Sequence, residues 1–164
     1  MALFKPKQVP VYEFRLSTGQ EPRATEEANL FELDGGLAWP PLHNMDELLD
    51  PNYQKVSYPL KKNEINYVMT FRCKDLKDFT EDQLSGLPMV SFFLRDFGIW
   101  PDRAPLVVLE YKRMVVEKLL HRHTRIHLYD SDPAILKALE SDRVIPHLVA
   151  CIKDPFVGEL AYSA

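Results

Sequence analysis

Residues 125–139 read RIHLYDSDPAILKAL, and this stretch sets the character of the fold. Its first five residues alternate between polar and apolar, as in a strand with one buried face. The SDP segment that follows, 131–133, marks a helix start, because aspartate favours the N-cap and proline favours the first turn. We therefore expect a strand over 125–129 and a helix that ends at Leu139, a β–α unit typical of domains that mix strands and helices.

Upstream of this unit, three segments predict a strand and two helical pieces. In residues 65–73 every second side chain is apolar, which predicts a half-buried strand. Thr80 is followed by two acidic residues and predicts a helix start, since acidic side chains suit the positive end of the helix dipole. Residues 88–97 carry apolar side chains at helical spacing and precede Gly98, so a second helical segment is expected there.

Three further segments complete the order of elements. The apolar run over 106–111 is typical of a central strand, and residues 144–152 predict a last strand. The segment 113–124 fits a strand and a helix, and its periodicity leaves both open. The order β-α-β-(β)-β-α-β predicts an α+β or α/β fold, built as a mixed-sheet two-layer domain over residues 61–164.

The first 60 residues differ in composition from the rest of the chain. They hold seven of the 13 prolines, and their 5 basic and 9 acidic residues account for the whole net charge of −4. Residues 11–16 alternate as a strand, and residues 25–33 predict a short helix stopped by two glycines. Because so long a stretch with little regular structure is unusual inside a compact domain, we expect an extended, proline-rich N-terminal arm over residues 1–60.

This N-terminal arm carries apolar side chains along its length, which suits contact with a partner protein. Proline pre-orders the chain, so such an arm lies along a neighbour at a low cost in entropy. The alternative is that the arm packs on its own sheet. The residues expected to bind the partner are Tyr12, Leu37, Trp39, Pro40, Leu42 and Tyr53.

Composition narrows the class of protein. Of the 164 residues, 46% are hydrophobic and 27% are charged, as in a globular domain that needs no disulfide or metal to fold. A net charge of −4 argues against nucleic-acid binding through bulk charge. No apolar run is long enough to span a membrane, and no secretory pattern is visible at the start. Cys73 and Cys151 favour a reducing intracellular compartment, and one disulfide between them stays open.

One short motif predicts an enzyme, in contrast to the partner-binding role expected for the N-terminal arm. Asp102 follows a proline, and Glu110 and Lys112 come later in a Glu-x-Lys step at the end of the apolar run. In metal-dependent nucleases of the PD-(D/E)xK type, two acids hold Mg²⁺ and a lysine on the same strand face activates water. The alternative function is therefore a Mg²⁺-dependent nuclease with these three catalytic residues. In the competing interpretation, these residues have no catalytic role: Asp102 lies in a loop, and the Glu-x-Lys step is the solvent-exposed end of a strand.

The other motifs predict no cofactor and no metal. His121 and His123 would share one face of a strand, as metal ligands do, and His127 is in phase with them. The cations between these histidines suit an exposed turn instead. Cys73 has no Cys-x-x-Cys partner, so we expect a buried, inert thiol. The chain also lacks a nucleophile elbow and a Gly-rich phosphate loop.

Residues 65–142 resemble a known family in the order of their segments. The segments are a strand at 67–73, the Arg95-Asp96-Phe97 step, a proline-opened apolar run at 105–108, a hairpin of 115–120 with 125–129, and a closing helix at 133–139. In this order they resemble the thioredoxin-like domain shared by certain mitochondrial ribosomal proteins and the B8-type accessory subunit of respiratory complex I. The resemblance implies a thioredoxin-like fold, a mitochondrial location and a non-catalytic place in a large complex.

Taken together, these patterns predict a non-catalytic accessory, structural subunit of a large multiprotein assembly. Its domain and its N-terminal arm would dock on protein subunits, and the acidic charge favours a respiratory-type complex over ribosomal RNA. Convergence of Asp102, Glu110 and Lys112 on one face would favour the nuclease instead.

Overall fold

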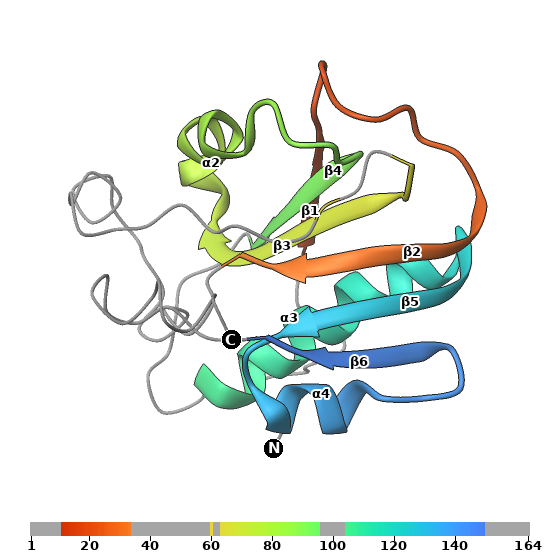
Figure 1. The fold of residues 1–164 in the computed structure, drawn as a ribbon. Helices are drawn as coiled ribbons and strands as arrows, with labels where there is room; N and C mark the ends of the chain where they lie inside the picture. The colour runs from red at the N-terminus through yellow and green to blue at the C-terminus, as the bar shows by residue number, and fades with distance from the viewer. Residues whose placement is uncertain (1–10, 34–59, 61–62, 96–103, 150–164) are drawn as a thin grey trace.

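The computed structural model contains a six-stranded mixed sheet with helices on both faces (Figure 1). It describes residues 11–33, 60, 63–95 and 104–149. The elements in chain order are β1 (Val11–Arg15), β2 (Thr25–Glu32), β3 (Asn66–Cys73), a 3-10 turn (Lys74–Leu76), α2 (Lys77–Leu84), β4 (Ser91–Arg95), α3 (Ala104–Leu120), β5 (His123–Asp130), α4 (Pro133–Leu139) and β6 (Val144–Leu148). Within these ranges, no helix is long and apolar enough to cross a membrane.

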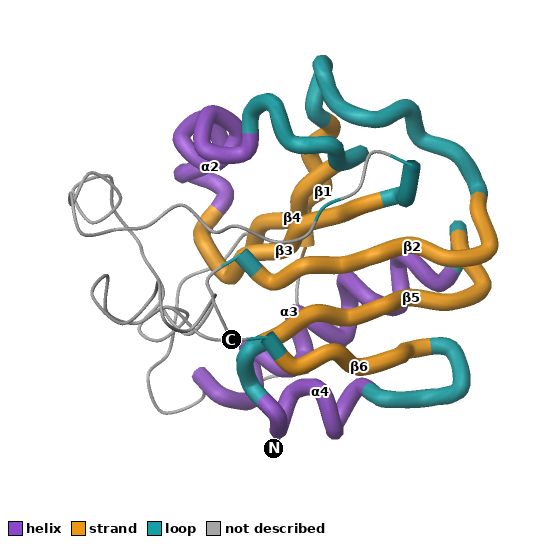
Figure 2. Tube along the Cα trace, in the orientation of Figure 1, coloured by secondary structure: helices purple, strands orange, loops and turns teal. Residues whose placement is uncertain are grey.

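The strands lie in the order β1-β4-β3-β2-β5-β6. The five strands from β4 to β6 are parallel to one another, and only β1 of the described strands runs antiparallel, beside β4 at one edge. Figure 2 shows the strands in orange, with β2, β5 and β6 side by side. The chain starts the parallel set at β2, adds β3 and β4 on one side, and then returns to add β5 and β6 on the other. This is the strand order of doubly wound nucleotide-binding folds, and its reversal point lies between β2 and β5.

Helices cover the two faces of the sheet separately. Alternate residues of the central strands, among them Leu30 and Leu128, pack with Tyr111 of α3 and Leu136 of α4. The residues between them, such as Phe31, join a second cluster that includes Leu84 of α2. Because the crossovers β3-α2-β4 and β4-α3-β5 run in opposite directions along the sheet, right-handed connections place their helices on opposite faces. The domain therefore has three layers, where two were predicted.

Several predicted elements are confirmed, and so is the mixed-sheet α+β or α/β class. Strands were expected over 11–16, 65–73 and 125–129, and they correspond to β1, β3 and β5. The helix after residue 131 is α4, and the Asp132 side chain caps it by accepting a hydrogen bond from the Ala134 amide at 2.9 Å. The last strand, β6, covers the first part of the segment expected over 144–152.

Three predictions of element type and one of a helix start are corrected. Residues 25–33 form no helix but the central strand β2, and the predicted helical segment over 88–97 contains the strand β4. β4 and the second part of β2, residues 28–32, are buried on both faces, so the alternation of polar and apolar residues is lost there. The apolar run over 106–111 is part of the helix α3. This helix continues to Leu120, so most of the segment 113–124, which fitted both a strand and a helix, is helical. Thr80 lies inside α2 instead of at its start.

The corrections also bear on the resemblance and on the predicted N-terminal arm. Residues 115–120 are helical, so they do not form the hairpin expected with 125–129. Residues 11–33 supply an edge strand and the central strand of the sheet. These residues therefore belong to the domain and not to an arm that ends at residue 60. The rest of the predicted arm, 1–10 and 34–59, lies outside the described residues.

Leu30 tests this placement of β2, because its side chain is fully buried against α3 and its neighbours. Leu30→Ala is expected to lower the free energy of unfolding by about 2–5 kcal/mol, since it removes buried methyl groups and leaves a cavity. Urea unfolding followed by circular dichroism measures the change.

Leu148→Ala is the matched control, since Leu148 is a strand leucine that is 65% exposed. Its effect is expected within about 0.5 kcal/mol. If Leu30→Ala left the stability of the domain unchanged, residues 25–32 would belong to a separable arm after all.

Candidate functional site

The buried charges of the molecule gather at one end of the sheet. Among the described residues, the buried Asp, Glu, Lys and Arg side chains are Glu32, Arg72, Arg95, Lys112 and Asp130. Three of them are the last residues of β2, β4 and β5, and Arg72 is the last but one of β3. Because these four strands are parallel, their carboxyl ends meet at one edge, and Lys112 reaches the same edge from α3. We call these five residues the carboxyl-end cluster.

Burial of a charged side chain costs free energy of folding unless an opposite charge or hydrogen bonds compensate it. Groups of buried charges are therefore rare in a plain scaffold and mark functional sites in many enzymes. In open parallel sheets, ligands bind outside the carboxyl ends of the strands, at the point where the strand order reverses. In this sheet that point lies between β2 and β5, the strands that end in Glu32 and Asp130. Position and charge thus indicate the same site.

Lys112 and Asp130 form the best-defined contact of the cluster. The Lys112 ammonium donates to Asp130 Oδ2 at 2.7 Å, and the two side chains are only 4% and 1% exposed. The other carboxylate oxygen, Oδ1, accepts the backbone amide of Asp132 at 2.9 Å. Asp130 is therefore held at both oxygens, by a cation from α3 and by the turn that leads into α4.

Glu32 is placed beside this pair by the register of the sheet. Phe31 of β2 lies opposite Tyr129 of β5, so the next residues, Glu32 and Asp130, lie side by side at the strand ends. Alternation turns both side chains toward the face of Leu30 and Leu128, which is the face on which α3 packs. Two carboxylates and one ammonium group therefore share that face at the reversal point.

Two arginines extend the cluster along the neighbouring strands. Arg95 donates from Nε to the carbonyl oxygen of Phe71, and its guanidinium lies 5.0 Å from the centre of the Phe71 ring. Arg72 donates from Nη1 to the Thr80 hydroxyl of α2 at 3.2 Å. On the face of α3 the cluster holds two cations, Lys112 and Arg95, and two carboxylates, Glu32 and Asp130, whereas Arg72 reaches α2 on the opposite face. Charged side chains at the end of a parallel sheet suit a ligand that itself carries charge.

The residues of the nuclease hypothesis are distributed differently from the expectation. Lys112 belongs to the carboxyl-end cluster, but Glu110 and Lys112 lie on the helix α3 and not on a strand. Two residues along a helix turn by about 200°, so the two side chains do not share a face as they would on a strand. Glu110 accepts from Arg113 Nε at 3.3 Å. Asp102 lies outside the described residues.

Of the residues expected to bind a partner, the structure describes only Tyr12, which is 37% exposed on the edge strand β1. Its ring stacks near Phe14 and lies 4.9 Å below the Lys74 ammonium. The other expected residues, Leu37, Trp39, Pro40, Leu42 and Tyr53, lie outside the described ranges. Cys73, at the end of β3, is a partly buried free thiol.

The histidines expected to share a strand face are separated by the turn before β5. His121 is exposed in that turn, whereas His123 is buried as the first residue of the strand. The hydroxyl of Tyr67 lies 2.8 Å from His123 Nε2, and the hydroxyl of Thr25 lies 2.9 Å from Nδ1. Within the described part of the chain, no group of three or more His, Cys, Asp or Glu side chains is arranged to hold a metal ion.

Comparison with known protein families, with curated proteins and with solved structures finds no match to this chain. The candidate site therefore depends on the geometry alone.

Sequence reasoning missed four members of the carboxyl-end cluster, Glu32, Arg72, Arg95 and Asp130. Asp130 was within reach, because it directly follows the correctly predicted strand over 125–129 and precedes a helix cap. Glu32 was hidden by the incorrect helix over 25–33. The two arginines can be assigned to one edge only when the strand order is known.

His123 generates a prediction about pH. Burial lowers its pKa below the usual value, and the nearby Arg122 cation lowers the pKa further. The unfolded chain therefore binds the proton more readily, so folding stability falls as the pH drops through about 6.5. His123→Gln is expected to flatten the fall in unfolding free energy between about pH 7 and pH 5, measured by urea unfolding at each pH.

His121→Gln serves as the control for loss of a histidine, since that side chain is exposed in the adjacent turn. A slope that is the same in His123→Gln and in the unmodified chain would contradict the assignment.

Proposed function

We propose that this chain is an enzyme that hydrolyses phosphate esters at the carboxyl end of its sheet, with Mg²⁺ as cofactor. The observation that carries the proposal is the gathering of all buried Asp, Glu, Lys and Arg side chains of the described residues at that edge. A structural scaffold gains nothing from burying five charged side chains at one edge of a sheet, because their burial costs free energy. A site that binds a charged ligand requires such side chains.

The charges of the cluster favour a phosphate group over other ligands. Transfer of a phosphoryl group requires little beyond positioning and stabilisation of the charge on its oxygens. Lys112 supplies a compact cation at the reversal point, and Arg72 and Arg95 add positive potential along β3 and β4.

The carboxylates provide the remaining functions. Mg²⁺ is commonly bound by one or two carboxylates together with substrate phosphate oxygens and water, so Asp130 suffices as the protein ligand. When bound, the ion would act as a Lewis acid on the phosphate. Asp130 is fixed by Lys112 and by the Asp132 amide, which holds its oxygens in one orientation. Glu32 is the candidate to accept a proton from the attacking water.

This proposal shares its reaction class with the nuclease hypothesis. Both use Mg²⁺ and Lys112 on a phosphate ester, but the acids are now Glu32 and Asp130 in place of Asp102 and Glu110. The accessory-subunit hypothesis, with its mitochondrial location and thioredoxin-like resemblance, stays a prediction. It depends mainly on residues 34–59, and Tyr12 is the described residue through which it can be tested for binding to a partner.

The proposal is tested with p-nitrophenyl phosphate and bis(p-nitrophenyl) phosphate as generic monoester and diester. Hydrolysis of one of them is expected with Mg²⁺ and is lost with EDTA. Asp130→Asn and Glu32→Gln keep the size of each side chain and are expected to lower kcat/KM by about 100-fold or more, since each removes a charge that acts on the reaction.

Glu26→Gln is the matched control for Glu32→Gln, because Glu26 lies on the same strand and is exposed. Circular dichroism confirms that each variant is folded before its activity is compared. Absence of hydrolysis of both esters, or full activity in Asp130→Asn, would contradict the proposal.

A further inference from the structure

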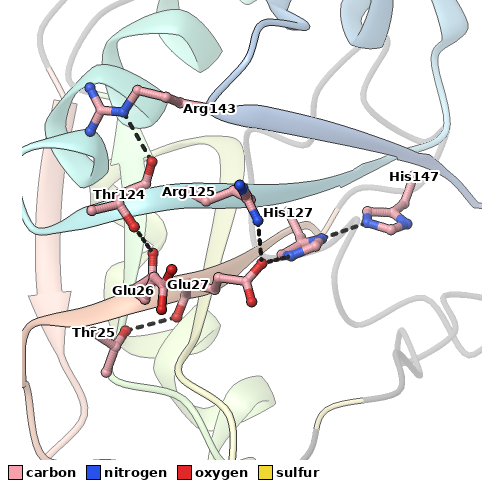
Figure 3. Close-up of polar contacts among 8 residues, drawn as sticks. All are labelled: Thr25, Glu26, Glu27, Thr124, Arg125, His127, Arg143 and His147. Atoms are coloured by element: carbon pink, nitrogen blue, oxygen red, sulfur yellow. Dashed lines mark hydrogen bonds and ion pairs between the residues drawn. The ribbon is translucent and has the colours of Figure 1, made fainter.

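A second polar cluster lies on the other face of the sheet, opposite to α3 and α4. Glu27 of β2, His127 of β5 and His147 of β6 follow one another across three adjacent strands (Figure 3). His127 Nε2 lies 2.9 Å from Glu27 Oε1, and His127 Nδ1 lies 2.8 Å from His147 Nε2. The two imidazoles therefore face each other nitrogen to nitrogen.

The carboxylate determines which nitrogen of His127 carries hydrogen. An ionised Glu27 only accepts hydrogen bonds, so Nε2 of His127 must donate to it. In the neutral imidazole, Nδ1 then has a free lone pair, and that lone pair points to His147. Histidines that bind metals are held in the same way, with the second ring nitrogen donating to a carboxylate.

An aromatic stack fixes the other histidine. The ring of Tyr129 lies 4.4 Å from the His147 ring and 4.4 Å from the Phe31 ring, measured between centroids. Tyr129 lies opposite His147 in the register of β5 and β6. The His147 ring is thus held by packing, and its Nε2 remains aimed at His127.

Solvent reaches this pair from one side. Glu27, His127, Tyr129 and His147 line a hollow of about 320 Å³ together with residues that include Asn29 and Glu64. The His127 side chain is 24% exposed, so solvent reaches it, and the lining of the hollow also includes the cation Arg23. The hollow leaves room for water molecules as further ligands of an ion.

We propose that His127 and His147 bind a zinc ion on this face, with Glu27 as the residue that orients His127. Zinc binds imidazole nitrogens at about 2.0–2.1 Å, and a tetrahedral site separates two of them by about 3.3 Å. The pair has to open by about half an ångström to admit the ion. The proton between the rings moves from Nε2 to Nδ1 of His147, so no proton is lost on binding. Water fills the two remaining positions.

The zinc site is independent of the proposed hydrolysis. Glu32 and Asp130 point to the α3 face of the sheet, whereas His127 alternates to the opposite one. Imidazole also favours zinc over Mg²⁺, which prefers oxygen ligands. The two sites therefore differ in place and in metal.

The experiment is isothermal titration of the full, EDTA-stripped chain with zinc chloride, together with thermal unfolding in the presence and absence of zinc. Zinc binding and a raised Tm are expected. His147→Ala and His127→Ala are expected to weaken binding by about 100-fold or more and to abolish the rise in Tm. Glu27→Gln should weaken binding by about 10–100-fold, as the loss of an orienting carboxylate does at known sites.

His121→Ala is the matched control, since it removes an exposed histidine elsewhere. This variant should bind zinc as the unmodified chain does. Absence of binding at millimolar zinc, or equal zinc affinity in His147→Ala and in the unmodified chain, would overturn the proposal.

Discussion

The parallel pairing of β2 with both β3 and β5 is the constraint on which the rest of the molecule depends. β2 lies between two strands that come after it in the chain, so the crossovers β3-α2-β4 and β4-α3-β5 run in opposite directions along the sheet and place helices on both faces. The same pairing creates the reversal point at the carboxyl end. The carboxylates of Glu32 and Asp130 can lie side by side only because β2 and β5 are neighbours in register.

The burial of charge follows from this geometry. A strand in the middle of a parallel sheet is covered on both faces, so a charged residue at its end is partly withdrawn from water by the helices beside it. Lys112 on α3 compensates Asp130, and the capping turn after β5 supplies a further hydrogen-bond donor. The cluster of Glu27, His127 and His147 is in a different environment. It lies on the face without α3 and α4, where half-exposed polar side chains remain accessible.

The sequence indicates some of these features and conceals others for physical reasons. The strands β3 and β5 were recognised from alternation, and α4 from the Asp132–Pro133 start. In β2 and α3, burial on several sides removes the alternation that separates strand from helix, so Leu30 was assigned to a helix and Val107 to a strand. Asp130 could be located from its predicted strand. Arg72, Arg95 and the His127–His147 pair could not be grouped, because grouping requires the order of strands, and that order is determined by long-range packing.

The central position of β2 has a consequence for how the chain folds during synthesis. Thr25 pairs with His123 across 98 residues, so β2 leaves the ribosome long before its second neighbour exists. During that interval one edge of an apolar strand has no partner, which is the condition under which nascent chains associate with chaperones or with each other. Closure of the sheet therefore waits for β5, and chains interrupted before residue 123 would expose an edge of the strand that later lies between β3 and β5 in the sheet.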